Sequence, residues 1–266
     1  MTMNQSNQRL QNAARGFSLV EMLVVIAIIG ILAGILLPVM AKAKEKAKVA
    51  QAKLEMGQIE NAIIAYKSEY QRMPMSAFAR NALTTTAPDF TFGTHGVSLL
   101  VTNGGPPAVY QTNNAELVAI LMDLTQYRNG NPTVNAGHSL NPKKIALLDG
   151  KPATAALPGI GPDGVYRDPW SNPYIVTVDG DGDGQVYDGF YRNRGVSRQN
   201  GQTGFNGLFN PDSATGGNSD FFAIRKQVAV WSFGPDGQAS MALRADEDGE
   251  PGGVKVRNSD NVLSWK

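Results

Sequence analysis

The longest apolar stretch of the chain runs from Phe17 to Ala41 and contains a single charged residue, Glu21. At about 1.5 Å of rise per residue, a helix over this stretch exceeds the roughly 30 Å of a bilayer's hydrocarbon core. The stretch is apolar on all faces, is longer than a signal-peptide core and is followed by no A-x-A cleavage site. The pattern therefore favours a membrane-spanning helix over a buried helix of a globular domain.

Beyond Pro38 the helical period continues, but charged residues enter it. Apolar side chains recur at spacings of three and four residues, as on one face of a helix, at Val49, Ala52, Met56, Ile59, Ile63, Tyr66 and Tyr70. We therefore expect an amphipathic continuation over residues 42–73, ended by Met73-Pro74 and packed on the protein's own sheet. A coiled coil is the alternative, but the stripe lacks strong leucine positions.

Residues 74–165 are rich in Thr, Asn, Gly and Pro and read as a loop-rich insertion. One short helix is predicted near residues 115–127, where Asn113 and Glu116 have capping-box spacing. Its apolar face consists of Leu117, Ile120, Leu121 and Leu124.

Residues 166–266 contain four runs typical of β-strands, at 174–178, 185–191, 226–234 and 238–244. Short turns separate the first pair and the last pair, so two antiparallel hairpins are expected. The predicted fold is α+β: a long N-terminal α-helix, half membrane-embedded and half amphipathic, packed on a small antiparallel β-sheet with a long insertion.

The charge is balanced, with 24 basic and 23 acidic residues, so nothing points to nucleic acid as a partner. Cysteine is absent, which excludes disulfides, thiolate nucleophiles and cysteine-ligated metals. No acid/base or nucleophilic set is evident, because His95 and His138 are isolated, and Pro162 interrupts the glycine string that begins at Gly159. We therefore do not expect an enzyme.

Asp179, Asp181 and Asp183 alternate with glycines, as at the start of an EF-hand calcium loop. The twelfth position holds Phe190 where an EF-hand has glutamate, and Asp188 is the candidate replacement. The flanks read as strands, so a glycine-rich hairpin turn without metal is the alternative.

Gly16-Phe17-Ser18-Leu19-Val20-Glu21, together with Pro38, resembles the processing site of type IV prepilins and type II secretion pseudopilins. The resemblance implies that prepilin peptidase removes residues 1–16 as a leader and that Phe17 is then methylated. It also implies that Glu21 of one subunit neutralises the Phe17 ammonium of a neighbour during assembly, since two charges that are costly in lipid become acceptable as a pair.

Topology follows from the resemblance and not from charge. The lysines at 42, 44, 46 and 48 would place the C-terminal side in the cytoplasm, whereas the resemblance implies a cytoplasmic N-terminus and a periplasmic domain. Gly30 and Gly34 form G-x-x-x-G, which permits close helix approach in a membrane. By resemblance, the helix can also unwind between Gly30 and Pro38 in the filament, because proline removes one helical hydrogen bond.

The C-terminal region also resembles the major pseudopilin, in "DPWSNPY", "WSFGPDGQ" and the last residues from Asp260 to Trp265. Ser171 and the long insertion are departures. The resemblance implies a Ca²⁺ site at Asp236, Asp260 and Asn261, to which Asp246, Glu247 and Asp248 could contribute. A solvated acidic loop is the alternative.

The sequence thus predicts a structural subunit of a periplasmic type II secretion pseudopilus, anchored in the bacterial inner membrane by a single span. The implied partners are further copies of the chain, prepilin peptidase, the inner-membrane assembly platform, minor pseudopilins and, before assembly, lipid. The alternatives are a type IV pilus subunit for adhesion or DNA uptake, or a membrane-tethered enzyme or calcium-dependent binding module.

Overall fold

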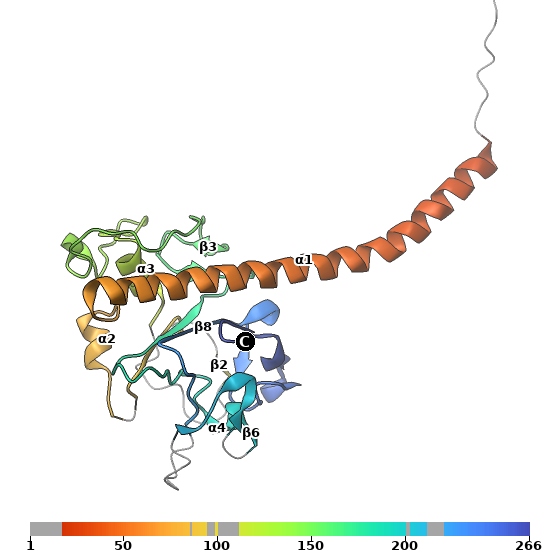
Figure 1. The fold of residues 1–266 in the computed structure, drawn as a ribbon. Coiled ribbons are helices and arrows are strands. Elements are labelled where there is room, and N and C mark those ends of the chain that lie inside the picture. The colour runs from red at the N-terminus through yellow and green to blue at the C-terminus, as the bar shows by residue number, and fades with distance from the viewer. Residues whose placement is uncertain (1–17, 86, 95–98, 101–111, 201–202, 212–220) are drawn as a thin grey trace, which may run out of the picture. The chain divides into compact units, whose positions relative to one another are not determined.

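The computed structural model describes residues 18–85, 87–94, 99–100, 112–200, 203–211 and 221–266. The chain divides into two compact units, residues 1–46 and 47–266. Helix α1 (Leu19–Tyr70) is continuous through Pro38 and carries the chain from the first unit into the second (Figure 1). It ends before the predicted Met73 because Gln71 adopts a left-handed backbone, with φ of 54°.

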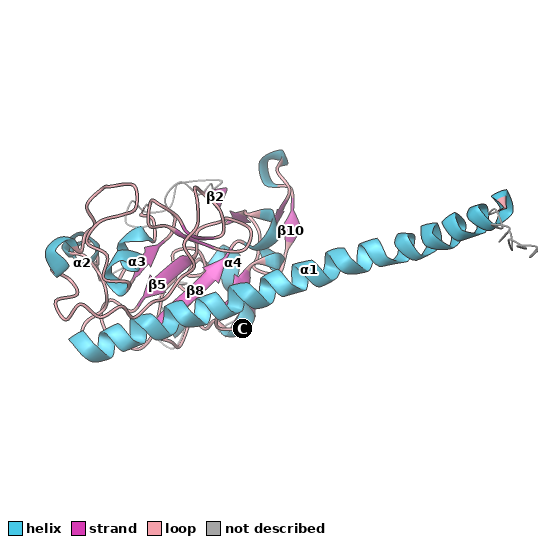
Figure 2. Cartoon of the chain, turned by 90° about the horizontal axis from the view of Figure 1, so that it is seen from above, coloured by secondary structure: helices cyan, strands magenta, loops and turns pink. Residues whose placement is uncertain are grey.

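The second unit is built on a four-stranded antiparallel sheet in the order β1–β5–β8–β12. Figure 2 shows β5 and β8, the two central strands, side by side. Its strands are β1 (Phe90–Phe92), β5 (Ile175–Val178), β8 (Val228–Ser232) and β12 (Val262–Leu263). The predicted stripe of α1 packs on this sheet, so the α+β class with a long helix against an antiparallel sheet is confirmed.

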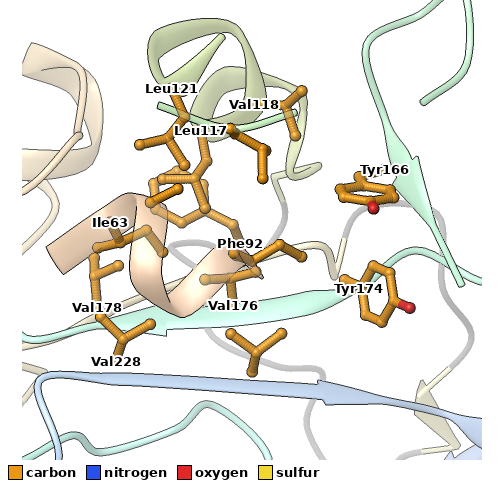
Figure 3. Close-up of a cluster of buried hydrophobic side chains, with 14 of the residues drawn as sticks. Ile63, Phe92, Leu117, Val118, Leu121, Tyr166, Tyr174, Val176, Val178 and Val228 are labelled. Carbon is orange, nitrogen blue, oxygen red and sulfur yellow. The ribbon is translucent and has the colours of Figure 1, made fainter. Parts of the chain in front are cut away.

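The two faces of the sheet carry two separate cores, because side chains alternate along each strand. Val176, Val178 and Val228 lie in the core between the sheet and α1, together with Ile63 of the helix (Figure 3). The buried residues of α1 in this core are Ala52, Met56, Ile59, Ala62, Ile63 and Tyr66. Ile175 and Trp231 face the opposite way and pack with an aromatic cluster that includes Phe190, Tyr191 and Phe233.

The two predicted hairpins are wrong. Strand β5 pairs with β1 and β8, and β8 pairs with β5 and β12. The run 185–191 contributes only a bridge from Val186 to Ile224, since its one carboxylate, Asp188, accepts the Phe190 and Tyr191 amides and holds a turn instead. From the run 238–244 only β9 (Ala239–Ser240) forms, and it pairs in parallel with β2 (Leu99–Leu100).

The insertion supplies more order than its composition predicts. It contributes strand β1 to the sheet and helix α3 (Ala115–Leu121), whose apolar residues cover α1. Helix α3 ends six residues before the predicted boundary of 127, because Asp123 has a φ of 57°. The predicted capping box is also wrong: the N-cap is Asn114, and Glu116 Oε1 accepts the Ser76 amide at 2.7 Å.

The remaining elements are short. They are α2 (Ala77–Asn81), η2 (Ala136–His138), β3 (Gly159–Ile160), β4 (Tyr166–Arg167), α4 (Arg194–Ser197), β6 (Arg198–Asn200), β7 (Thr203–Gly204), η3 (Phe205–Gly207), η5 (Gly234–Asp236), β10 (Asp248–Gly249), η6 (Pro251–Gly253), β11 (Val256–Arg257) and η7 (Asn258–Asp260).

Candidate functional site

The apolar part of α1 is open to its surroundings. Its large hydrophobic side chains range from 44% exposed at Val25 to 80% at Leu19. Within the described part of the chain, α1 is the one helix long and apolar enough to cross a membrane. An apolar surface of this extent requires lipid or protein to cover it.

Glu21 lies in the first turn of this helix. The Ser18 amide donates to Glu21 Oε2 at 2.8 Å, and the Glu21 amide donates to Ser18 Oγ at 3.2 Å. This reciprocal capping box gives Glu21 a role within its own chain that our sequence analysis missed, although Ser-x-x-Glu is its usual signature. Gly16 and Phe17 lie outside the described residues.

Gly30, Gly34 and Pro38 lie inside the apolar part of α1. A Cβ atom added at either glycine would meet nothing within 4 Å, so both positions are open to a neighbouring helix. Their roles in close packing and in unwinding stay predictions.

Asp236 and Asp260 are brought together by two short turns, η5 after strand β8 and η7 before strand β12. Asp236 accepts the Gln238 amide on Oδ1 at 2.9 Å and the Arg257 amide on Oδ2 at 2.7 Å. The structure therefore joins two of the predicted ligands and fixes one by backbone hydrogen bonds.

Both carboxylate oxygens of Asp260 are buried and have no hydrogen-bond partner in the described structure. The same is true of the side-chain oxygen Oδ1 of Asn261. Burial, together with the adjacent Asp236 charge, raises the pKa of Asp260 to about 7. Asn261 is held from its other side, because its Nδ2 donates to the Tyr191 hydroxyl at 2.9 Å. Buried oxygens that lack a donor are costly unless a cation or another donor satisfies them. The donor set fits a hard cation such as Ca²⁺.

The acidic residues between these turns are engaged elsewhere. Asp246 and Glu247 each form an ion pair with Arg244 at 3.3 Å. Asp248 accepts a hydrogen bond from the Ser259 hydroxyl at 2.5 Å.

The aspartate-glycine loop after strand β5 gathers a different set of carboxylates from the one predicted. Asp179 and Asp181 lie with Asp89, and one oxygen of each falls within 4.8 Å of the others. Asp89 directly precedes strand β1, and its oxygens accept the amides of Gly180 at 2.9 Å and Tyr187 at 2.6 Å. Our sequence analysis missed Asp89 because it belongs to the insertion.

The pKa values of the Asp89 and Asp179 carboxyl groups at this loop are raised mainly by burial and secondarily by neighbouring like charges. Burial and, to a smaller extent, the charges of Asp181 and Asp179 raise the pKa of Asp89 to about 7, although two backbone amides donate to it. Burial also raises the pKa of Asp179, which is partly offset by its hydrogen bonds and by Lys67 on α1, 3.7 Å away.

Asp183 and Asp188 are not brought into this group. Asp183 turns to Gln185 and accepts its amide at 2.7 Å. Asp188 is buried in the opposite core, where Oδ2 accepts the Thr177 hydroxyl at 2.6 Å and the Trp231 indole at 3.1 Å. Its other oxygen accepts two backbone amides, so the carboxylate is fully occupied.

Residues 11–37 match the prokaryotic N-terminal methylation motif. The chain is similar to type II secretion system core protein G of Aeromonas hydrophila, with 39% identity over 77 residues, 28% of this chain and 54% of the relative. The same protein of Pectobacterium carotovorum is 38% identical over 71 residues, covering 27% and 46%. In Escherichia coli it is 39% identical over 66 residues, covering 25% and 46%.

The chain thus spans about half the length of the curated relatives it matches. No solved structure matches it. The motif and the relatives confirm the resemblance to type IV pilin-like pseudopilins of type II secretion that the sequence predicted.

Proposed function

We propose that the chain is a non-enzymatic structural subunit of a periplasmic pseudopilus that drives protein export by type II secretion. The observation that carries the proposal is the methylation motif at residues 11–37, joined to an apolar helix that is exposed along its length. Such a helix is suited to two environments in turn, lipid before assembly and the helices of other subunits after it.

Cleavage after Gly16 would make Phe17 the new N-terminus and free its ammonium beside the capping box of Ser18 and Glu21. Within an apolar bundle both charges need a partner. A neighbouring subunit shifted along the helix axis brings its Glu21 to this ammonium, and the pair sets the register between subunits. Prepilin peptidase, the inner-membrane assembly platform and minor pseudopilins are the partners of this pathway.

The proposed topology has a single span in the bacterial inner membrane, with residues 1–16 in the cytoplasm and the second unit in the periplasm. Secretion is preferred over a type IV pilus because the matched relatives are named as secretion core proteins. A membrane-tethered enzyme or calcium-dependent binding module is less favoured, because the relatives described above are named as secretion core proteins.

Calcium belongs to the same proposal. Asp236, Asp260 and Asn261 would hold Ca²⁺ and so tie the C-terminal turn to the sheet in a chain without cysteine. A second Ca²⁺ position is the loop after β5. There Asp89 joins the predicted ligands Asp179 and Asp181, whereas Asp183 and Asp188 are not part of the site.

The intact mass of the chain extracted from membranes of cells with active prepilin peptidase tests the proposal. We expect a chain that begins at Phe17 and carries one added methyl group. The same cells without the peptidase provide the control and should yield the chain from Met1. A chain from Met1 in both strains would contradict the proposal.

A further inference from the structure

The side of α1 that faces away from the sheet carries a line of uncharged residues, where an amphipathic helix normally presents charged side chains to solvent. Gln51, Leu54, Gln58, Asn61 and Ala65 form a line about 140° around the helix from the buried stripe. A solvent-facing line on an amphipathic helix is normally charged, whereas here Leu54 is 71% exposed.

The insertion turns this line into a groove. The segment 147–152 lies along the helix and borders two adjoining open hollows of about 440 and 380 Å³, both of which are lined by Gln58 and Asp149. Figure 1 shows the later part of the insertion, in green, following one side of α1. The groove therefore exists because this chain carries its insertion at that position.

Acidic groups predominate in the larger hollow. Glu55 and Asp149 line it with one basic residue, Lys151. Glu55 is engaged by the Tyr174 hydroxyl at 2.5 Å. Asp149 is exposed and forms no hydrogen bond or ion pair with its side chain in the described part of the chain.

A complementary surface lies earlier on α1. Lys42, Lys44 and Lys46 are exposed and have no ion pair among the described residues. Alanines at 41, 43 and 47 alternate with them and keep the helix slim, which allows close approach to a neighbour.

We infer that the groove between α1 and residues 147–152 binds the lysine-rich segment 42–46 of a second copy of this chain. The inference rests on the proposed filament, in which parallel helices are displaced along the axis. A displacement of about 16 Å brings Lys44 of one copy level with Glu55 of another. This copy is displaced farther along the axis than the neighbour whose Glu21 reaches Phe17, which needs about 6 Å. The insertion thus forms an inter-subunit contact that binds the lysine-rich segment 42–46.

Disulfide cross-linking tests this interface cleanly, because the natural chain has no cysteine. The full chain with Ala43→Cys and Lys151→Cys keeps Lys44 and Asp149, and it is oxidised in cells that assemble the polymer. We expect dimers and higher oligomers that disappear on reduction. Each single variant should give no ladder.

Charge reversal supplies the second measurement. Asp149→Lys should abolish the ladder, and adding Lys44→Glu and Lys46→Glu should restore it. Glu250→Lys, the same charge change on an exposed residue outside the groove, should leave it intact. Normal polymer without a ladder overturns the interface and leaves the proposed function standing, whereas absence of polymer from the unmutated chain overturns both.

Discussion

Gly234 and Asp260 touch through their backbones: a Cβ atom on Gly234 would overlap the carbonyl oxygen of Asp260. Gly234 also has a φ of 68°, a region that side chains disfavour. This contact sets the turn that carries Asp236 against the turn that carries Asp260. The calcium proposal depends on it.

Gly234→Ala should destabilise the second unit by about 3 kcal/mol, since it adds backbone strain and a steric overlap that cannot relax without separating the two turns. Denaturant unfolding of the detergent-solubilised chain, followed by tryptophan fluorescence, measures this loss. Gly182→Ala is the matched control, because Gly182 has a φ of 82° but open space around it. It should cost only about 1 kcal/mol. Equal losses from both variants would contradict the close contact.

Asp260→Asn should separate the cost of the buried carboxylate from the benefit of the metal. Without calcium the variant should be more stable than the natural chain, because an unpartnered charge becomes neutral. With calcium it should lose the stabilisation of about 2.7 kcal/mol that a hundredfold excess of ligand over Kd provides. Melting temperatures in EGTA, Ca²⁺ and Mg²⁺ measure both effects.

Asp89→Asn examines the second position in the same way. If the loop after β5 binds Ca²⁺, this variant reduces the calcium response that remains in Asp260→Asn. A melting curve of the natural chain that ignores EGTA would sink both metal positions.

Asp168 should make stability depend on pH. Burial raises its pKa to about 6 from 3.8, although the Ser232 hydroxyl and two amides donate to it. The protonated carboxyl is thus favoured by folding, so its contribution is complete below about pH 4 and is lost as the pH rises through 6. The free energy of unfolding of the natural chain, measured relative to that of Asp168→Asn, should therefore decrease by about 3 kcal/mol between pH 4 and pH 7. A difference that stays constant with pH would show that burial does not perturb this carboxyl.

Adjacent isoleucines on α1 test the packing of the helix on the sheet. Ile63 is fully buried, while Ile64 is 49% exposed. Ile63→Ala should cost about 3 kcal/mol by leaving a cavity, and Ile64→Ala about 0.5 kcal/mol or less. Urea unfolding compares them directly. Similar costs would mean that the buried stripe has been assigned to the wrong face.

Glu21→Gln should leave cleavage after Gly16 intact but prevent assembly, because the Phe17 ammonium loses its partner. Ser18→Ala removes only the capping hydroxyl within the same chain and should still assemble. Electron microscopy of sheared filaments, with intact mass as the check on processing, distinguishes the two. Filaments from Glu21→Gln would reduce Glu21 to a helix cap.

The sequence by itself determined the helix from Leu19 to Tyr70, the stripe it buries and strands β5 and β8. These features are local. A hydrophobic period of 3.6 residues predicts a helix and the face that it buries, and a β-branched run predicts a strand. The processing motif is local as well.

Only the tertiary structure decided which segments pair. Strand β1 reaches the sheet from within the loop-rich insertion, and Asp89 joins Asp179 across ninety residues of sequence. The partner of a strand is the distant segment that best covers the apolar face of the sheet and pairs with the backbone groups of its edge. The local hydrophobic pattern does not indicate which segment this is. The groove on α1 was likewise decided by tertiary structure. The sequence shows that one line of residues on the helix lacks charges, but it does not show that residues 147–152 lie beside that line.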